Sequence, residues 1–318
     1  MDLRPKIVVI GSLNMDLVVK ARRAPKRGET VLGEEIHFVP GGKGANQAVA
    51  LARLGAETTL IGALGADPFG VELMKALQKD GVNTSCVKVM DSEATGVASI
   101  LLAEGDNSIV VVPGANTQCL PEDLDRYEEK IAEADLVLLQ LEIPLVTVEY
   151  AVKLARKHGK TVMLNPAPAQ TLPLELLGMV DYITPNRSEL ALLVGMSEET
   201  LVDQGIGKLL DLGVSCCVTT LGAEGVALRK KGGSMLKVSG YKVPVVDTTG
   251  AGDAFNAGLA YALAQKKSLL EAAEFAVRVS ALAVTKFGAQ GGMPTLAEVD
   301  EYFRRDDEEN EENWHYKQ

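Results

Sequence analysis

The 318-residue chain has few of the side chains that bind metals or form disulfides, with three histidines and four cysteines. The histidines, His37, His158 and His315, lie far apart in the sequence, so they predict neither a metal site nor a nucleophilic triad and argue against a hydrolase. No two cysteines form a CxxC pair, which argues against a zinc site. This cysteine usage predicts buried thiols in a reducing setting. We expect a cytoplasmic protein, or an organellar stroma protein that has lost a transit peptide.

The chain also lacks an excess of positive charge and long apolar runs. Lys and Arg number 32 against 43 Asp and Glu, for a formal net charge of −11. General nucleic-acid binders need a basic face, so no nucleic acid is expected as a partner. No apolar stretch reaches the roughly 20 residues that span a bilayer, so no membrane partner is expected. The acidic run over 306–313 predicts a solvated, flexible tail over 304–318, with an interaction tail as the alternative.

Hydrophobic residues make up 47% of the chain and charged residues 24%, which is typical of a soluble globular protein with a substantial core. Apolar runs typical of strands and of helices alternate along the sequence. Strands are predicted at 6–11, 58–62, 136–141, 161–164, 182–184 and 216–220, and helices at 45–54, 70–79, 146–157, 188–194 and 206–212. This alternation predicts the α/β class, with a three-layer α/β/α architecture and a mostly parallel central sheet.

Two stretches interrupt the alternation. The segments at about 16–39 and 96–112 contain β-rich pieces without a helix, and a turn sequence at 104–107 joins the pieces of the second segment. Together they predict a small β-sheet that projects from the main sheet. Such a sheet can be a lid over a site, a dimerisation surface, or both. Later in the chain, 254–283 is strongly helical with a break near 266–268.

Three small residues, Gly250, Ala251 and Gly252, precede a predicted helix within the segment DTTGAGD at 247–253. The free amides of a first helical turn and the helix dipole favour an anion, and small residues let a phosphate approach the backbone. Asp253 lies in that first turn. There its carboxylate can accept a proton from a hydroxyl that attacks a phosphoryl group. The alternative is that Asp253 only caps the helix and the glycines only form the turn.

A second glycine-rich segment, PGGKGANQ at 40–47, also precedes a predicted helix. Lys43 and Asn46 supply polar donors, Asn46 can also accept, and neighbouring glycines such as Gly42 let the backbone approach a ligand. The spacing is not that of a Walker A loop, and the first strand is not followed by a GxGxxG fingerprint. Without other signals, this turn does not identify a ligand class.

Polar residues stand just past two of the predicted strands. Asn14 and Asp16 follow the first strand, and Glu142 follows the strand at 136–141. An open parallel sheet binds its ligands beyond the carboxyl ends of its strands, which is where these three side chains are expected. Carboxylates and amides suit a polyol, since each sugar hydroxyl both donates and accepts. Each residue taken singly is equally consistent with a capping or surface polar role.

Taken together, these ordered segments resemble the PfkB-type carbohydrate kinase family, in its ribokinase-like members. The family signatures stand as GGKGANQ at 41–47 and DTTGAGDAFN at 247–256. Further matching segments are GSLNMD at 11–16, QLE at 140–142, NPAPA at 165–169, TPNRSE at 184–189 and TLGAEG at 220–225. The resemblance covers about residues 5–303. It implies one kinase domain over 1–303, in which the segments at about 16–39 and 96–112 form a β-sheet lid.

The resemblance implies ATP-dependent phosphorylation of D-ribose at its 5-hydroxyl, giving D-ribose 5-phosphate and ADP. Asp253 would be the base that activates the hydroxyl, and the backbone of Gly250, Ala251 and Gly252 an anion hole for the transferring phosphoryl group. Apolar lid side chains such as Ala98 and Ile100 would cover the sugar and exclude water. The residues implied to hold the sugar are Asn14, Asp16, Gly42, Lys43, Asn46, Glu142 and Asp253.

The resemblance also implies ATP, Mg²⁺ and a monovalent cation such as K⁺ as cofactors. The ATP site would be formed by Asn186, Thr220, Leu221, Gly222, Ala223, Glu224, Gly225 and Gly252. The monovalent cation, held mainly by carbonyl oxygens, matches Asp247, Thr249, Ala283, Lys286, Gly288 and Gly292, and Glu189 completes an Asn-x-x-Glu motif associated with Mg²⁺. Val277 departs from relatives that carry a polar residue near the adenine, so the contacts to the base and ribose of ATP are not predicted.

Ribose is the expected substrate, because fructokinase-like members usually carry other residues at the position of Lys43. Kinases for 2-deoxyribose, another sugar or a nucleoside remain alternatives within the family. From another class, the alternative is a non-catalytic regulator that binds a sugar or nucleotide. The intact Gly250–Asp253 segment argues against that regulator, because a binder without activity would have little need of it. We expect a homodimer formed through the β-sheet lid.

Overall fold

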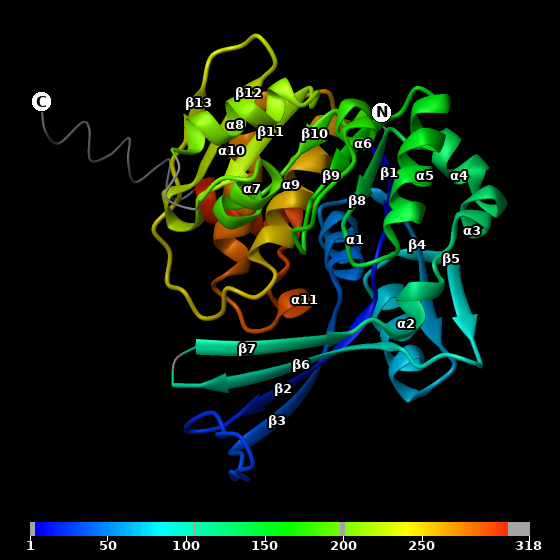
Figure 1. Ribbon diagram of the computed structural model, residues 1–318, viewed down its shortest axis with the longest axis vertical. Helices are drawn as coiled ribbons and strands as arrows, with labels where there is room; N and C mark the ends of the chain where they lie inside the picture. The colour runs from blue at the N-terminus through cyan, green and yellow to red at the C-terminus, as the bar shows by residue number, and fades with distance from the viewer. Residues whose placement is uncertain (1–3, 105, 198–200, 305–318) are drawn as a thin grey trace, which may run out of the picture.

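The computed structural model describes residues 4–104, 106–197 and 201–304, and a nine-stranded sheet forms the centre of this part of the chain (Figure 1). In order across the sheet, the strands are β13 (Leu236–Val238), β12 (Val226–Lys230), β11 (Cys216–Thr220), β10 (Tyr182–Ile183), β9 (Thr161–Leu164), β8 (Leu136–Leu139), β1 (Lys6–Ile10), β4 (Glu57–Gly65) and β5 (Asn83–Met90). Every neighbouring pair from β11 to β5 is parallel, so the predicted mostly parallel sheet is confirmed.

The antiparallel edge formed by β12 and β13 was not expected from the alternation of strands and helices. Only residues 221–225 connect β11 to β12, which is too short for a crossover helix. The chain therefore turns back on itself at this edge. The turn between β11 and β12 contains part of the TLGAEG segment.

Helices cover both faces of the sheet, as predicted. Along β1, Ile7 and Val9 belong to one core cluster, whereas Val8 and Ile10 belong to the cluster on the opposite face. This alternation explains why the strand has no polar residue between Ile7 and Ile10: both of its faces are buried.

The first cluster is packed against α1 (Lys43–Arg53), α2 (Pro68–Lys79), α9 (Ala251–Ala264) and α10 (Leu269–Ala283). The second is packed against α3 (Pro121–Arg126), α4 (Glu128–Glu133), α5 (Leu145–Lys157), α6 (Leu174–Met179), α7 (Arg187–Leu193) and α8 (Val202–Asp211). Short helical turns lie at η1 (Gly114–Gln118), η2 (Gly222–Glu224) and α11 (Ala289–Gly292), and residues 296–304 are helical.

The break predicted near 266–268 separates α9 from α10. Lys266 has a φ of 65°, which the α-helix does not allow, and Ser268 begins α10 as its N-cap. The Ser268 side chain accepts from the Glu271 amide, while the Glu271 carboxylate accepts from the Ser268 amide at 2.8 Å. This capping box fixes the start of α10, so the two helices pack side by side as a hairpin.

A second sheet of four strands projects from the main sheet, in the order β3 (Glu35–Gly41), β2 (Asn14–Lys20), β6 (Gly96–Ala103) and β7 (Asp106–Val112) (Figure 1). The β-rich segments at 16–39 and 96–112 therefore form one small sheet, as expected. Strand β2 pairs antiparallel with β3 and parallel with β6. Every residue of β7 is exposed, including the apolar run from Ile109 to Val112.

Within the described ranges, none of the helices has both the length and the apolar character needed to cross a bilayer. The predicted acidic tail begins at residue 304, and 305–318 lie outside the described residues.

Leu138→Ala should destabilise the fold strongly, because Leu138 is fully buried in the central strand β8. We expect a loss of about 2–5 kcal/mol in the free energy of unfolding, measured by urea denaturation. Leu174→Ala, at a side chain that is 62% exposed on α6, is the matched control and should change the free energy by less than about 0.5 kcal/mol. Equal losses in the two variants would contradict the assignment of β8 to the core.

Candidate active site

The glycine-rich segment at 40–47 carries the chain from the second sheet into α1. Gly42 is the N-cap of α1 and has a φ of 87°, a conformation that favours glycine. A β-carbon there would lie 2.6 Å from the backbone nitrogen of Asn14. This close approach places the start of α1 against the start of β2. The segment at 40–47 therefore lies next to Asn14 in space.

The glycine-rich segment at 247–253 likewise leads the chain into a helix, α9. Gly250, with a φ of 78°, is the N-cap of that helix, and Asp253 lies in its first turn. The Ala251 amide, one of the three predicted for an anion hole, donates to the carbonyl of Thr248 at 3.1 Å. The first turn of a 14-residue helix also carries the positive end of the helix dipole.

Asp253 is buried against the start of α1, although more than 200 residues separate the two segments. Its Oδ2 accepts a hydrogen bond from Asn46 Nδ2 and its Oδ1 accepts one from Gln47 Nε2, each at 2.9 Å. Only 6% of Asp253 is exposed. Two neutral amides therefore hold the carboxylate in place without neutralising its charge.

Four carboxylates surround Lys43 at this junction. Burial alone would lower the pKa of the Lys43 ammonium, but the charges of Asp253, Glu142, Glu189 and Asp16 raise that pKa above its usual value. Three of the predicted sugar residues, Asp16, Lys43 and Glu142, thus share one electrostatic environment with Asp253, the predicted base. A lysine in this setting remains protonated and balances part of the surrounding negative charge.

The carboxyl group of Asp16 has a strongly shifted pKa. Burial, followed by the charges of Glu142 and Asp253, raises its pKa to about 7, and the charge of Lys43 partly opposes this increase. The side chain is 8% exposed on β2. Near neutral pH, Asp16 therefore exchanges between a protonated and an ionised form.

Glu142, beyond the end of β8, accepts from the Ser12 hydroxyl at 2.5 Å and from the Lys43 amide at 3.1 Å. Asn14 is held by a partner that the sequence did not indicate. Asn116 Nδ2 donates to Asn14 Oδ1 at 2.8 Å, and the Asn116 side chain also bonds to the backbone of Leu13 in both directions. Asn116 belongs to η1, and no pattern in the sequence connects that turn to the first strand.

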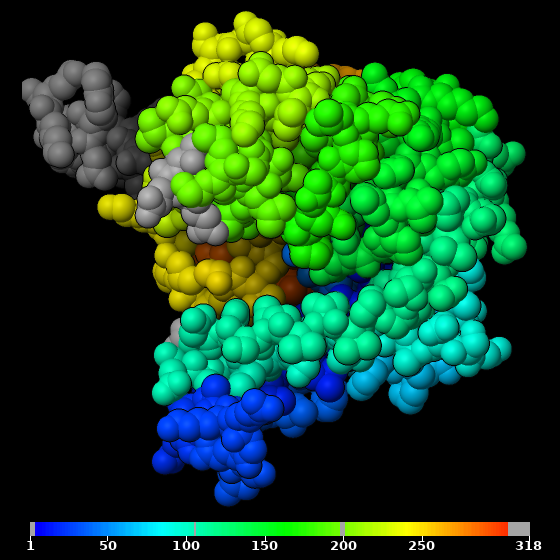
Figure 2. All heavy atoms as spheres, in the orientation of Figure 1, coloured from blue at the N-terminus to red at the C-terminus, as the bar shows by residue number. Residues whose placement is uncertain are grey.

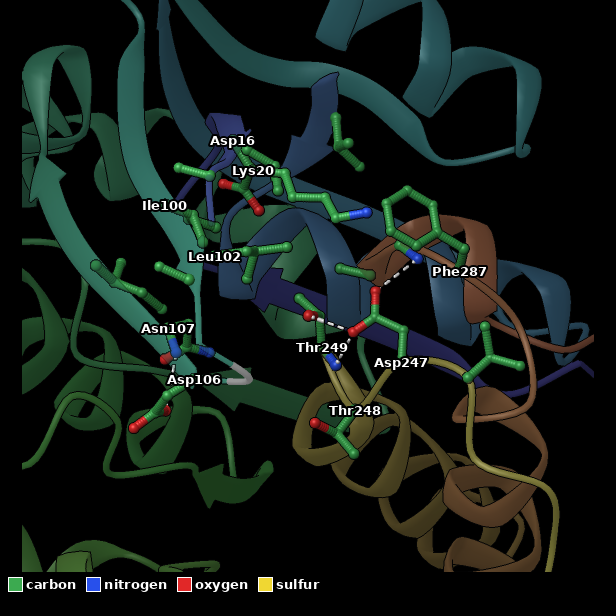
Figure 3. Close-up of a pocket in the computed structure, with 18 of the residues that line it drawn as sticks. Asp16, Lys20, Ile100, Leu102, Asp106, Asn107, Asp247, Thr248, Thr249 and Phe287 are labelled. Carbon is green, nitrogen blue, oxygen red and sulfur yellow. Dashed lines mark hydrogen bonds between the residues drawn. The ribbon is translucent and has the colours of Figure 1, made fainter. Parts of the chain in front are cut away.

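Two cavities meet at the start of α9. One, of about 630 Å³, lies between the second sheet and the loops around Asp247 and Phe287, and the other, of about 550 Å³, lies between the β11–β12 turn and α10. Thr248 lines both. Figure 2 shows the hollow between the second sheet and the rest of the molecule. In Figure 3, Asp16 and Ile100 of the second sheet lie across the first cavity from Asp247 and Thr249.

The predicted sugar residues are divided among these spaces. Asp16 lines the first cavity, and Asn14 and Glu142 line a third cavity of about 430 Å³ together with Asn116. Asn46 and Asp253 are buried between α1 and α9. Of the two apolar residues expected to cover a sugar, Ile100 lines the first cavity, whereas Ala98 is buried opposite Asp16 in the β2–β6 pairing.

The second cavity contains only part of the predicted nucleotide set. Leu221 packs against the core, Glu224 forms an ion pair with Arg187 at 2.7 Å, and Asn186 caps α7, so these three side chains are directed elsewhere. Val277, the departure from the family pattern, lines the cavity. The predicted residues that line it are Thr220, Gly222, Ala223, Gly225 and Gly252.

The residues matched to a monovalent cation gather around Asp247. Its carboxylate accepts from the Thr249 amide and hydroxyl, at 2.9 and 2.7 Å, and from the Gly288 amide at 2.9 Å. A β-carbon at Gly292 would lie 2.6 Å from the carbonyl oxygen of Ala283 and 3.7 Å from that of Lys286, so the two carbonyls converge. The Lys286 side chain pairs with Glu298 and contributes only its backbone.

Glu189 forms a capping box with Asn186, in which each side chain accepts from the other residue's amide at 2.8 Å. Burial raises the pKa of Glu189, and Lys43 lowers it in part. Within the described residues, no group of three or more His, Cys, Asp or Glu side chains is arranged to hold a metal ion. Any divalent ion at Glu189 therefore needs ligands from a bound molecule or from the backbone.

A model of the pfkB family carbohydrate kinases matches residues 4–296. The chain belongs to this family. It is 44% identical over 295 residues to a Bacillus subtilis protein named Ribokinase, covering 93% of this chain and 98% of that protein. A Salmonella typhimurium protein named Deoxyribokinase is 37% identical over 300 residues, covering 93% and 98%. The solved structure of Arabidopsis thaliana ribokinase complexed with ribose and ATP aligns with a TM-score of 0.88 at 38% identity, covering 93% of this chain and 98% of that one.

Family membership and fold, both expected from the sequence, are confirmed, and the chain is a carbohydrate kinase. It uses ATP, as the likeness to the ATP-bound structure supports. Reasoning from the sequence missed two residues that hold predicted site residues: Gln47, which donates to Asp253, and Asn116, which donates to Asn14. Gln47 follows Asn46 directly in the GGKGANQ segment, so its place on α1 was a usable signal, whereas Asn116 reaches the site only through the fold.

Asp16→Asn should make the protein more stable at pH 8. The folded state raises the pKa of Asp16 from 3.8 to about 7, so its ionisation between these pH values costs folding free energy that the variant does not lose. We expect the variant to gain about 2–4 kcal/mol over the parent at pH 8 and no advantage below pH 4, from urea unfolding across this range. Asp106→Asn, at an exposed position of β7, is the control. A difference that is constant with pH would contradict this account.

Proposed function

We propose that this kinase transfers the γ-phosphoryl group of ATP to the 5-hydroxyl of D-ribose, giving D-ribose 5-phosphate and ADP. The observation that carries the proposal is the meeting of Asp253, Asn46 and Lys43 at the start of α9, between two cavities. The substrate is supported by relatives named Ribokinase and by the Arabidopsis ribokinase complex with ribose and ATP.

In this proposal, the sugar lies among the polar groups at the carboxyl ends of β1 and β8. Asn14, Asp16, Lys43, Asn46 and Glu142 offer both donors and acceptors, as a polyol requires, and the close-packed backbone at Gly42 completes the set. Asn46 Oδ1 is buried and has no hydrogen-bond partner in the described structure, which is consistent with an acceptor kept for a sugar hydroxyl.

Asp253 then acts as the base. Each carboxylate oxygen already accepts one amide hydrogen, and each retains a further lone pair for the proton of the attacking hydroxyl. The amides of Gly250 and Gly252, with the dipole of α9, oppose the charge that develops on the transferring phosphoryl group; the Ala251 amide contributes once its bond to Thr248 opens. Positioning and charge stabilisation are the main requirements of phosphoryl transfer.

The nucleotide is proposed to occupy the 550 Å³ cavity, with the base between the β11–β12 turn and α10, near Val277. Thr248 and Gly252 at its inner end bring the phosphates to the start of α9. Asn186, Leu221 and Glu224 support this site through the backbone and through the Arg187–Glu224 pair rather than by lining the cavity.

Two cations complete the proposal. The converging carbonyls of Ala283 and Lys286, next to the Asp247 carboxylate, fit a monovalent ion such as K⁺, with Thr249, Gly288 and Gly292 forming the surrounding loop. Mg²⁺ is proposed to bind with ATP, whose phosphates supply oxygens, near the Glu189 carboxylate in the Asn-x-x-Glu motif. When bound, Mg²⁺ would reduce the negative charge of the phosphates.

The second sheet is proposed to act as a lid, with Ile100 over the sugar, and as the surface of a homodimer. The exposed apolar residues of β7, with Val110 66% and Val112 59% exposed, support the second role. A cytoplasmic setting is proposed because all four cysteines are buried free thiols.

Asp253→Asn should lower kcat by about 10²–10⁴-fold, because the amide cannot accept the hydroxyl proton as a base. Initial rates of ADP release, with circular dichroism to confirm folding, test this expectation. Asp123→Asn is the matched control, since Asp123 is a buried aspartate that pairs with Lys88 at 3.2 Å, outside the site. It should retain kcat within about twofold. A folded Asp253→Asn enzyme with near-normal turnover would remove Asp253 from the role of base.

An ADP-release screen across pentoses, hexoses and nucleosides should show the highest kcat/KM for D-ribose, with higher activity in K⁺ than in Na⁺. The decisive comparison is ribose against 2-deoxyribose, because a Salmonella relative is named Deoxyribokinase. The cluster of carboxylates and amides around Lys43 favours the sugar with the additional hydroxyl. A preference for 2-deoxyribose would contradict the proposal that ribose is the substrate. Binding of a sugar or nucleotide without ADP release would favour the alternative of a non-catalytic regulator.

A further inference from the structure

We infer that Gln47 is a positioning residue for Asp253 and that Gln140 helps to set the orientation of the Gln47 amide. The inference rests on the proposed role of Asp253 as the base. It is based on a buried network of hydrogen bonds that ends on Oδ1 of the Asp253 carboxylate. Neither glutamine was assigned a role from the sequence.

The network closes into a ring. Gln47 Nε2 donates to Asp253 Oδ1 at 2.9 Å and to Asn165 Oδ1 at 3.2 Å. Asn165 Nδ2 donates to the Thr184 carbonyl at 3.2 Å, and the Thr184 hydroxyl donates to Asn256 Oδ1 at 2.5 Å. Asn256 lies one turn after Asp253 on α9, and its Nδ2 donates to the Gly252 carbonyl at 2.8 Å. The ring therefore returns to the helical turn from which it started.

The five members come from four parts of the fold. Gln47 is on α1, Asn165 follows β9, Thr184 follows β10, and Asp253 and Asn256 share α9. All five are at most 6% exposed. The ring thus fixes the first turn of α9 relative to the carboxyl ends of two strands and to α1, and the position of the proposed base depends on this frame.

Gln140 and the acceptor-only Asp253 carboxylate together fix which way the Gln47 amide points, and Gln140 Oε1 has no hydrogen-bond partner in the described structure. Gln140 Nε2 donates to Gln47 Oε1 at 2.6 Å, so the Gln47 oxygen faces β8 and the Gln47 nitrogen faces Asp253. With the amide reversed, two oxygens would face each other at Asp253 and two donors would face each other at Gln140. Both glutamines are fully buried, so water cannot compensate for that arrangement.

The consequence is a carboxylate held at a fixed angle in both the free and the bound enzyme. Loss of the Gln47 donor should misplace the base at the moment of transfer, while the groups that bind the sugar and the nucleotide stay in place. The expected signature is a decrease in kcat with little change in either KM. A ring that only stabilises the fold would lower the melting temperature and leave kcat unchanged.

The first test is Gln47→Met, which keeps the size of the side chain but removes its donors. We expect kcat to fall by about 10–100-fold, the value of a hydrogen bond to a charged group, with KM for ribose and ATP within about threefold of the parent. Gln47→Glu is the second variant and keeps the acceptor for Gln140 but places oxygen toward Asp253; it should show the same loss. If both folded variants retain kcat within about twofold, the inference is wrong.

Thr147→Val is the matched control. Thr147 is fully buried on α5, on the other face of the sheet from α1 and α9, and its hydroxyl donates to the Cys119 carbonyl at 2.7 Å. The variant should lower the melting temperature to an extent comparable with Gln47→Met but leave kcat within about twofold. An equal fall of kcat in both variants would show that lost stability, not position, causes the effect, and would overturn the inference.

A double-mutant cycle tests the role of Gln140. Gln140→Met alone should lower kcat by about 3–10-fold, and the double variant with Gln47→Met should be no slower than Gln47→Met alone, because Gln140 acts through Gln47. Losses that multiply would contradict that role. The Asp253→Asn measurement distinguishes a failure of this inference from a failure of the proposed function. If Asp253→Asn is inactive and the Gln47 variants are fully active, only this inference is refuted. If Asp253→Asn is active, the proposed role of Asp253 as the base is refuted.

Discussion

The contact between the first turns of α1 and α9 is the constraint on which the site depends. It buries the Asp253 carboxylate, and a buried carboxylate is costly unless hydrogen bonds replace its water. Asn46 and Gln47 supply those bonds from consecutive positions of one helix. Because both partners are neutral amides, the charge of the carboxylate is kept and its orientation is fixed. A salt bridge would have stabilised the same charge but occupied an oxygen that the proposed base needs to accept a proton.

The surrounding charges follow from the same arrangement. When the two helix starts are brought together, four carboxylates act on a single lysine, and burial, together with the charges of Glu142 and Asp253, raises the pKa of Asp16 to about 7. Such a cluster opposes folding, and under the proposed function it favours a ligand whose hydroxyls can share its acceptors. Active sites commonly contain such groups, which lower the free energy of unfolding but serve to bind a polar ligand.

The second sheet forms one wall of the 630 Å³ cavity, opposite the loop that leads into α9. Strand β2 begins at Asn14, directly beyond the end of β1, so the chain that carries the first polar residues also builds the sheet that faces the α9 loop. The register of β2 against β6 places Asp16 opposite Ala98 and Val18 opposite Ile100. The cavity between this sheet and Asp247 is thus a direct result of strand pairing, and its two walls come from opposite ends of the chain (Figure 3).

The sequence by itself determined the class of the fold, most element positions and the two glycine-rich helix starts, because periodicity, glycine and capping residues act over a few neighbouring positions. Its local motifs also predicted Asp253, Lys43 and Asn46 as site residues. Only the tertiary structure decided that Gln47 and Asn116 hold the site, that Leu221 and Glu224 turn away from the nucleotide cavity, and that β12 runs antiparallel. These features depend on hydrogen bonds and packing between segments up to about 200 residues apart, and on the length of one connection, which local patterns do not specify.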